Sequence, residues 1–290
     1  MYNAGFKDIL TLIRLPVTIA VTFTAFTAMF MVKGDFQAGT LWSVAGIFLL
    51  AAGASAFNQY QEWPYDELMD RTRRRPIPSR RISPAEGLRI ALIGIAGGLV
   101  ILMYESTGLC LILGVFNLIW YNGVYTPLKR ITAFAVVPGA LTGVIPIFMG
   151  WTAAGGSLLA PEVLFLAFFL FIWQMPHFWL LTLKYGHEYR AAGFPVLTDF
   201  FNEVQVKMVV MGWMIASSAA SYMLIYFKIL HLPVLGYALI GLNITLLLLL
   251  AYQLFIAAAI RYRLIFIAAN LFMMIVMLSL IADKLIIPIH

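Results

Sequence analysis

Nine long apolar stretches, separated by short polar segments, cover most of the 290 residues. A helix that crosses the hydrocarbon core of a bilayer needs about 20 predominantly apolar residues, and each stretch approaches that length. The stretches are 15–32, 39–57, 86–104, 107–125, 132–151, 161–179, 204–227, 232–256 and 262–283. Because they are continuous rather than alternating, a transmembrane β-barrel is disfavoured. The pattern predicts an all-α polytopic membrane protein, a single integral membrane domain over residues 1–290 with nine transmembrane helices.

The composition supports this prediction and excludes a soluble protein. Hydrophobic residues make up 62% of the chain and charged residues 11%, whereas a soluble domain is about half apolar and a quarter charged. The single cysteine, Cys110, excludes an intrachain disulfide and a metal cluster built from cysteines. We therefore expect the lipid bilayer as a partner and no nucleic acid.

Lysine and arginine divide cleanly between the two sides of the predicted helices. With the N-terminus on side one, only Lys33, Lys228 and Lys284 of the 19 basic residues fall on the other side. Basic residues are enriched in cytoplasmic loops. We expect a multi-pass protein of the cell (inner) membrane with a cytoplasmic N-terminus and an external C-terminus. The long loops 58–85 and 180–203 are then both cytoplasmic, and we expect the chemistry there.

Four side chains that carry oxygen recur every fourth residue after the second apolar stretch: Asn58, Glu62, Asp66 and Asp70. On a helix this spacing places them along one face, where like charges repel each other. A bound cation would relieve that repulsion, and ligands that are all oxygens favour a hard ion, Mg²⁺ or Ca²⁺. Mg²⁺ commonly takes one or two carboxylates and completes its shell with water and substrate phosphates. The stripe therefore indicates a metal–phosphate site.

An arginine cluster that includes Arg71 and Arg75 follows this stripe directly. Guanidinium groups form paired hydrogen bonds with phosphate oxygens, which suits a diphosphate. Pro64 interrupts the stripe and disfavours helix at Trp63, so we expect a kink with two ligands on each side. The alternative is a solvated loop whose arginines only mark the cytoplasmic side.

These residues resemble a known motif. The segment Asn58-x3-Glu62-x3-Asp66-x2-Met69-Asp70-Arg71-Thr72-x2-Arg75-Pro76 is similar to the first acidic motif of the UbiA superfamily of intramembrane prenyltransferases, and its ending looks like that of the protoheme IX farnesyltransferases. Further matches are Tyr125-Thr-Pro-Leu-Lys129-Arg130, Trp173-Gln-x-Pro-His177 and Glu188-Tyr-x2-Ala-Gly-x-Pro-x-Leu197. Pro64 departs from the pattern, because the family usually shows an acid there.

The resemblance implies a UbiA-type helical bundle and an activity. It implies Mg²⁺-dependent transfer of a farnesyl group from farnesyl diphosphate to a vinyl group of heme B, giving heme O and diphosphate, with a heme A synthase downstream. The alternatives are a related prenyltransferase that acts on a quinone precursor or another aromatic acceptor, and a transporter without catalysis. Transporters tend to carry ionisable residues in mid-membrane, whereas the acids of this chain cluster in the predicted loops.

The resemblance also assigns site residues. It implies a catalytic set of Asn58, Glu62, Asp66, Asp70, Lys129 and Glu188, all but Lys129 as metal ligands. It also implies a second set of residues that bind the substrates: Arg71, Arg75, Arg130, His177, Lys184, Tyr189 and Arg190. Lys184 and Glu188 lie four residues apart, so an ordinary helix pair is the alternative for them. His177 lies near hydrocarbon, where a histidine is costly unless partnered; the resemblance suggests contact with heme, and a hydrogen bond to a neighbouring helix is the alternative.

Overall fold

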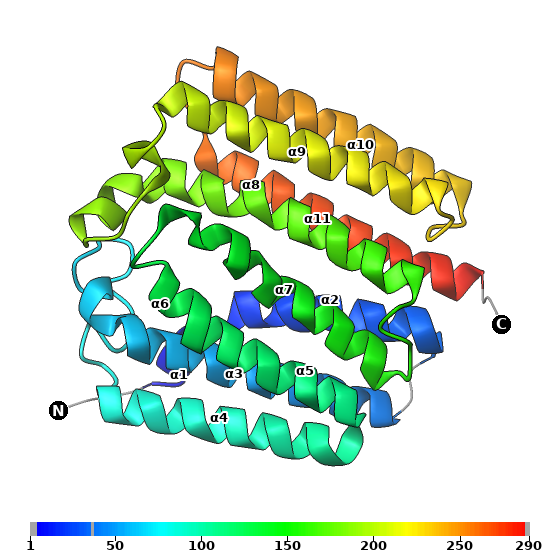
Figure 1. The fold of residues 1–290 in the computed structure, drawn as a ribbon, viewed down its shortest axis with the longest axis horizontal. Coiled ribbons are helices and arrows are strands. Elements are labelled where there is room, and N and C mark those ends of the chain that lie inside the picture. The colour runs from blue at the N-terminus through cyan, green and yellow to red at the C-terminus, as the bar shows by residue number, and fades with distance from the viewer. Residues whose placement is uncertain (1–4, 36–37, 288–290) are drawn as a thin grey trace. The chain divides into compact units, whose positions relative to one another are not determined.

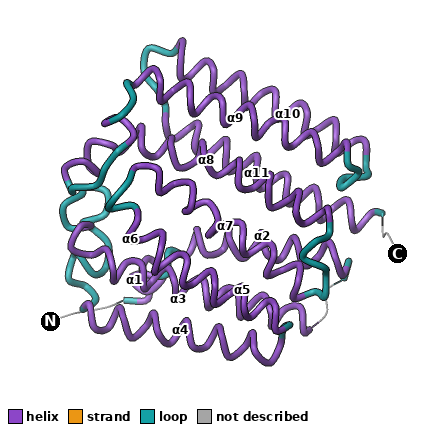
Figure 2. The backbone as a smooth tube through the Cα atoms, viewed as in Figure 1, coloured by secondary structure: helices purple, strands orange, loops and turns teal. Residues whose placement is uncertain are grey.

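The structure is a computed structural model and describes residues 5–35 and 38–287. All regular structure within these ranges is helical, as Figure 2 shows. Nine helical segments in the described part are long and apolar enough to cross a membrane. The prediction of an all-α protein with nine transmembrane helices is confirmed.

The helices follow one another along the chain, and the connections after α3 and α8 are longer than the others (Figure 1). A short helix α1 (Phe6–Leu12) precedes the spans α2 (Leu15–Lys33), α3 (Ala38–Asp66) and α4 (Pro84–Glu105). The fourth span joins α5 (Gly108–Leu118), a π-helix (Ile119–Tyr125) and α6 (Thr126–Leu128), and the fifth is α7 (Val136–Ala153), preceded by a 3-10 turn (Ala133–Ala135). The others are α8 (Pro161–Ala191), α9 (Glu203–Tyr226), α10 (Pro233–Ala251) with a π-helix (Tyr252–Ile256), and α11 (Tyr262–Ile286); a 3-10 turn (Leu197–Asp199) lies between α8 and α9.

The chain divides into two compact units. The first comprises residues 1–157 and 187–196, and the second comprises 158–186 and 197–290. Helix α8 contributes to both, since only its last turn belongs to the first unit.

Within the first unit, α3 and α4 pack along most of their lengths (Figure 1). Two glycines permit this approach. A methyl group on Gly53 would lie 2.5 Å from the backbone nitrogen of Ile95, and one on Gly98 would lie 2.5 Å from that of Leu50. Small residues let membrane helices approach until their backbones touch, and dispersion contacts then hold them. This packing fixes the position of α3, which carries the acidic stripe.

Within the second unit, buried polar groups join the helices. The Asn243 amide donates hydrogen bonds to the Ser218 carbonyl and to the Ser221 hydroxyl, which links α10 to α9. Asp283 near the end of α11 is buried and accepts hydrogen bonds from the backbone N–H groups of His231 and Leu232, just before α10 begins. A carboxylate beside the first N–H groups of a helix is stabilising. Asp283 and His231 thus have a structural role here.

Two helices extend further than the apolar pattern predicts. Pro64 lies inside α3, and the helix continues to Asp66, so Asp66 lies on the same helix as Asn58 and Glu62 and the expected division of the ligands into two pairs is wrong. Pro64 has no backbone N–H to donate, and its ring crowds the carbonyl one turn earlier; side-chain contacts to neighbouring segments hold the last turns. Helix α8 continues to Ala191, which corrects the prediction that a loop begins at residue 180. Lys184 and Glu188 are therefore helical.

Candidate active site

The first three residues of the predicted stripe lie together on the last turns of α3. Asn58, Glu62 and Asp66 are 0%, 6% and 1% exposed, although all three are polar and two are acidic. Burial of an ionised carboxylate costs several kcal/mol unless it is paired. Each acid must therefore have a partner in the first unit.

Asp70 is not brought together with these three residues. The helix ends at Asp66, and Asp70 lies in the following turns. Its side chain is 75% exposed and forms a surface ion pair with Arg73 at 3.0 Å. The four-residue spacing places residues on one face only while the chain stays helical, which is why the sequence pattern extends the stripe too far.

Two cations partner the buried acids. The Lys129 ammonium contacts the Glu62 carboxylate, and the Arg75 guanidinium lies 2.7 Å from the Asp66 carboxylate. Burial lowers the pKa of Lys129 and of Arg75, and the facing carboxylates oppose that shift. The structure thus places both cations, which the resemblance assigns to the site, in contact with the buried acids.

A third cation, Arg14, joins the site from the turn between α1 and α2. Its backbone is left-handed, with φ of 52°, and its guanidinium donates to the Tyr121 hydroxyl at 3.3 Å. Burial tends to lower the pKa of Arg14, but the facing Tyr121 and Glu62 raise it on balance. A non-glycine residue in this backbone region is uncommon and often marks a functional site.

The π-helix supplies the aromatic wall of the site. The Tyr121 and Tyr125 rings stack with centroids 6.0 Å apart, and the Lys129 ammonium lies 5.3 Å from the centre of the Tyr125 ring. Gly139 of α7 makes room for that ring, because a methyl group there would lie 2.5 Å from a carbon of Tyr125. A π-helical turn changes the directions of side chains and is frequent at functional sites.

Amides connect the π-helix and α6 to α3. The Asn58 amide donates to the Thr126 hydroxyl at 2.9 Å. Gln61 and Asn122 exchange hydrogen bonds: the Gln61 amide donates to the Asn122 carbonyl at 3.0 Å, and the Asn122 amide donates to the Gln61 side chain at 3.1 Å. Arg130 donates to the Gln61 carbonyl at 2.8 Å. These contacts hold the acidic end of α3 in place.

The last turn of α8 meets the loop after α3. The Glu188 carboxylate accepts from the Arg71 backbone N–H at 2.9 Å, and the Arg71 guanidinium donates to the Tyr189 hydroxyl at 2.9 Å. Arg190 is exposed one residue further. In this structure Glu188 fixes the arginine loop; its predicted role as a metal ligand stays a prediction.

The residues present fit an ion that oxygen atoms ligate. The Asn58 carbonyl oxygen is buried and has no hydrogen-bond partner in the described part of the chain, and the carboxylates of Glu62 and Asp66 follow on the same helix face. Among the described residues, no three His, Cys, Asp or Glu side chains are close enough to hold a metal by themselves. An ion bound here would need further oxygen ligands, which substrate phosphates supply in many Mg²⁺ sites.

His177 and Lys184 belong to the second unit. The His177 ring lies 4.5 Å from that of Phe266 and 5.4 Å from that of Trp173, measured between centroids. Its Nδ1 has no hydrogen-bond partner among the described residues. The alternative role, a hydrogen bond through Nδ1 to a neighbouring helix, is therefore not observed. The Lys184 ammonium lies over the Tyr185 ring, 4.7 Å from its centre.

Sequence reasoning missed Arg14, Gln61, Tyr121 and Asn122. Arg14 is not distinguished by its position, because the positive-inside rule accounts for any basic residue at the start of a helix. Asn122 carried a usable signal, because a buried amide within an apolar span needs a partner. The roles of Tyr121 and Tyr125 depend on the π-helix, which hydropathy does not reveal.

Comparisons of sequence find similar proteins over most of the chain. The model of the UbiA prenyltransferase family matches residues 20–281. A protoheme IX farnesyltransferase of Geobacter sulfurreducens is 40% identical over 191 residues, which cover 66% of this chain and 70% of that protein. One of Oleidesulfovibrio alaskensis is 36% identical over 186 residues, 64% of this chain and 66% of that one.

Comparisons of structure show the same fold. A structure described as that of digeranylgeranylglyceryl phosphate synthase has a TM-score of 0.74 at 16% identity, covering 97% of this chain and 99% of the other. A UbiA homologue from Archaeoglobus fulgidus bound to DMAPP and Mg²⁺ has a TM-score of 0.67 at 13% identity, covering 94% and 99%.

Proposed function

Because the chain belongs to the UbiA prenyltransferase family, we propose that it transfers a farnesyl group from farnesyl diphosphate to a vinyl group of heme B, giving heme O and diphosphate. Relatives at 36–40% identity are named protoheme IX farnesyltransferases, which supports this donor and this acceptor. A heme A synthase would act on the product.

The observation that carries the proposal is the polar centre of the first unit. Glu62 and Asp66 are buried, and Arg75 and Lys129 contact them. With Arg14 the centre holds more cationic than anionic groups. Such an excess of positive charge, in an otherwise apolar bundle, suits a substrate with a diphosphate head and an isoprenoid tail.

In the first step, the residues of the polar centre assist cleavage of the bond between the farnesyl group and the diphosphate. The allylic carbon–oxygen bond of farnesyl diphosphate cleaves, and its electron pair leaves with the diphosphate. Arg75, Lys129 and Arg14 stabilise the charge that develops on the diphosphate oxygens, an interaction stronger in the transition state than before it. Asn58, Glu62 and Asp66 would hold Mg²⁺, which when bound stabilises the same charge as a Lewis acid.

In the second step the vinyl group attacks the allylic carbon. The faces of Tyr121 and Tyr125 carry negative quadrupole charge and suit the allylic cation. Attack leaves a cation on the carbon beside the porphyrin. One water adds its hydroxyl group to that carbon, and the remaining proton of the water is released. His177 contacts the heme through the nitrogen that lacks a partner, since a neutral imidazole is a good iron ligand.

The direct test is a transfer assay with the purified protein in lipid nanodiscs. Farnesyl diphosphate, heme B and Mg²⁺ should yield a heme whose mass has increased by one farnesyl group and one hydroxyl group. EDTA should stop the reaction, and an aromatic acid offered in place of heme should give no product. Prenylation of the aromatic acid, with heme left unchanged, would favour the quinone-precursor alternative.

We propose that the protein lies in the plasma membrane and that its site faces the cytoplasm. Single cysteines at Arg73 and Ser157, both exposed, in a Cys110→Ala background should then react with an impermeant thiol reagent from opposite sides of sealed membranes. The cysteine at position 73 should be labelled only after the cytoplasmic face is opened. Labelling of both from one side would contradict this topology.

His177→Ala should weaken heme binding by about tenfold or more, the equivalent of roughly 1.4 kcal/mol, and should leave farnesyl diphosphate binding unchanged. The reason is that its aromatic surroundings offer no group for a diphosphate. Heme titration by absorbance, beside a binding assay for the diphosphate, measures both. His187→Ala removes an exposed histidine and serves as the matched control. Unchanged heme affinity in a folded His177→Ala protein would remove this role.

A further inference from the structure

A cavity of about 550 Å³ opens in the second unit between α8 and the start of α11. Its lining combines basic and apolar side chains. They are Lys184 on α8 and Ile260, Arg261, Tyr262, Arg263, Leu264 and Ile267 at the other wall. The motifs shared with the prenyltransferases do not extend to the wall at 260–267, so no role is yet assigned there.

The cavity carries a concentrated positive charge. Lys184, Arg261 and Arg263 line it, and none of its described lining residues is acidic. The carboxylate that interacts with Tyr262 is Glu203, which already pairs with Lys207 at 2.8 Å. Three cations without an acid among them repel one another, so an anionic ligand would stabilise them.

The arginine wall is anchored to the fold. The buried Gln253, within the second π-helix, accepts a hydrogen bond from the Arg261 backbone N–H at 3.0 Å. That π-helix ends with the Ala257 N–H donating to the Tyr252 carbonyl at 2.9 Å. The backbone that carries the two arginines is therefore held in place, while their side chains stay exposed.

The cavity lies on the helix faces that carry the His177 aromatic cluster. Lys184 follows His177 by seven residues, two helical turns or about 10 Å along α8, on nearly the same face. On α11, Arg263 precedes Phe266 by three residues, and the ring of Phe266 contacts His177. The two helices thus present an aromatic and imidazole surface at one level and cations at the next.

We propose that this cavity holds the carboxylate edge of the porphyrin acceptor, with Arg261, Arg263 and Lys184 binding its two propionates. The proposal rests on the proposed function, which supplies heme as the acceptor. Heme has an apolar ring and two carboxylates on one edge. The apolar side chains of Leu264 and Ile267 suit the ring, and three cations suit two carboxylates, since charged hydrogen bonds from arginine to carboxylate are strong and directional.

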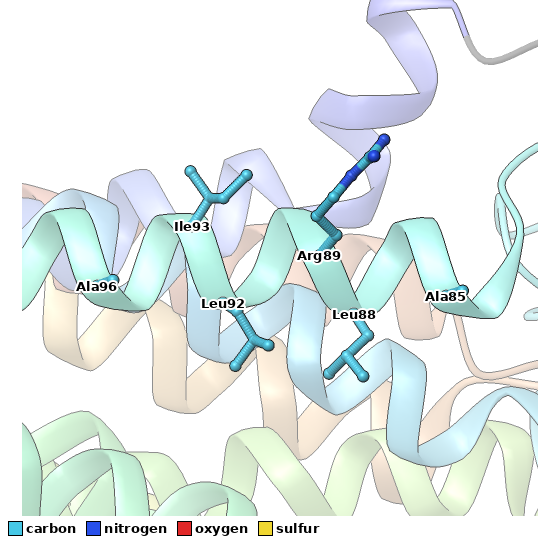
Figure 3. A pocket seen from close by; sticks show the side chains of 6 residues that line it. All are labelled: Ala85, Leu88, Arg89, Leu92, Ile93 and Ala96. Carbon is cyan, nitrogen blue, oxygen red and sulfur yellow. The ribbon is translucent and has the colours of Figure 1, made fainter.

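A second hollow, on the surface of α4 in the first unit, differs in kind (Figure 3). Residues of α4 alone line it, and Leu88 and Leu92 point to one side while Arg89 and Ile93 point to the other. Arg89 is its single basic residue and lies 3.4 Å from Glu86. This hollow lacks the group of three cations that lines the cavity of the second unit. Substitution of Arg89 is therefore a matched control for substitution of Arg261 and Arg263.

The test compares heme with its dimethyl ester, which keeps the ring and the iron but lacks the two charges. Both are titrated by absorbance into the full-length protein in phosphatidylcholine nanodiscs. Wild type should bind heme about tenfold more tightly than the ester. Arg261→Gln/Arg263→Gln should remove most of this preference, with Lys184 retaining the rest, and should leave ester affinity unchanged. Arg89→Gln should behave as wild type.

Two results would overturn the proposal. One is an equal affinity of wild type for heme and for the ester. The other is an unchanged preference for heme in the double variant. Nanodiscs that contain phosphatidylglycerol test whether a lipid headgroup occupies the cavity instead. A headgroup is identified as the occupant if wild type has no preference for heme over the ester and if phosphatidylglycerol weakens the binding of heme to wild type alone. The preference is measured without turnover, so a failure of the proposed function appears separately, as wild type that binds heme by its propionates but forms no farnesylated product.

Discussion

Asp66→Asn should reduce farnesyl transfer by at least about a thousandfold, the effect of losing roughly 4 kcal/mol of transition-state stabilisation. The substitution removes a buried carboxylate from the metal-binding set and removes the partner of Arg75, which lies 2.7 Å away. Turnover of heme, followed by product mass in the presence of saturating Mg²⁺, measures the loss. Binding of Mg²⁺ together with farnesyl diphosphate should weaken in parallel.

Asp70→Asn is the matched control for Asp66→Asn. The two residues are four positions apart and chemically identical, but Asp70 is exposed and pairs with Arg73. Exposed ion pairs contribute about 0–1 kcal/mol, so turnover should change by less than about threefold. Equal damage from both substitutions would restore the four-ligand stripe that the sequence alone predicts. Normal turnover in Asp66→Asn would remove the metal role of the whole stripe.

Lys129→Met should destabilise the folded protein by about 2–4 kcal/mol, because it leaves the Glu62 carboxylate buried without its cation. Lys129 is about one-fifth exposed, which places the loss below that of a fully buried pair. Thermal unfolding in detergent, monitored by light scattering and by intrinsic fluorescence, measures the shift. Activity should be lost as well.

A double variant separates stability from chemistry at this pair. Glu62→Gln/Lys129→Met removes both charges and should recover most of the lost stability, since a buried pair replaced as a whole costs little. Turnover should not recover, because both a metal ligand and a diphosphate contact are absent. A double variant as unstable as Lys129→Met would show that the two side chains do not act as a pair.

Hydropathy and charge were sufficient to predict the nine spans. The bilayer requires a similar length of each span, and it requires a helix because every backbone hydrogen bond must be made within the segment. The ends of the helices that carry the site were not predicted. Helix α3 passes Pro64 because contacts such as that of Asn58 with Thr126 hold its last turns. Such contacts join residues far apart in the sequence, so a local pattern does not contain them.

The site shows the same division between local and distant information. The stripe from Asn58 to Asp66 was predictable since its members share one helix. The position of Arg14 opposite Tyr121 was not, because it requires the left-handed turn before α2 and the π-helix of the fourth span. The partition of the predicted residues between two units, with His177 and Lys184 in the second, likewise has no signature in the spacing of the motifs.

The π-helix at Ile119–Tyr125 contains one residue more than an α-helix with the same number of turns needs. Deleting a single residue there would leave the apolar length of the span nearly unchanged, so hydropathy and membrane insertion would hardly register the loss. It would turn every side chain on one side of the deletion by about 100° relative to the other side. Tyr121 and Asn122 would then no longer face Arg14 and Gln61. A homologue with a one-residue gap at this place in an alignment is therefore a membrane protein of the same outline with a differently built active site, and alignments that slide the gap into a neighbouring loop would conceal that difference.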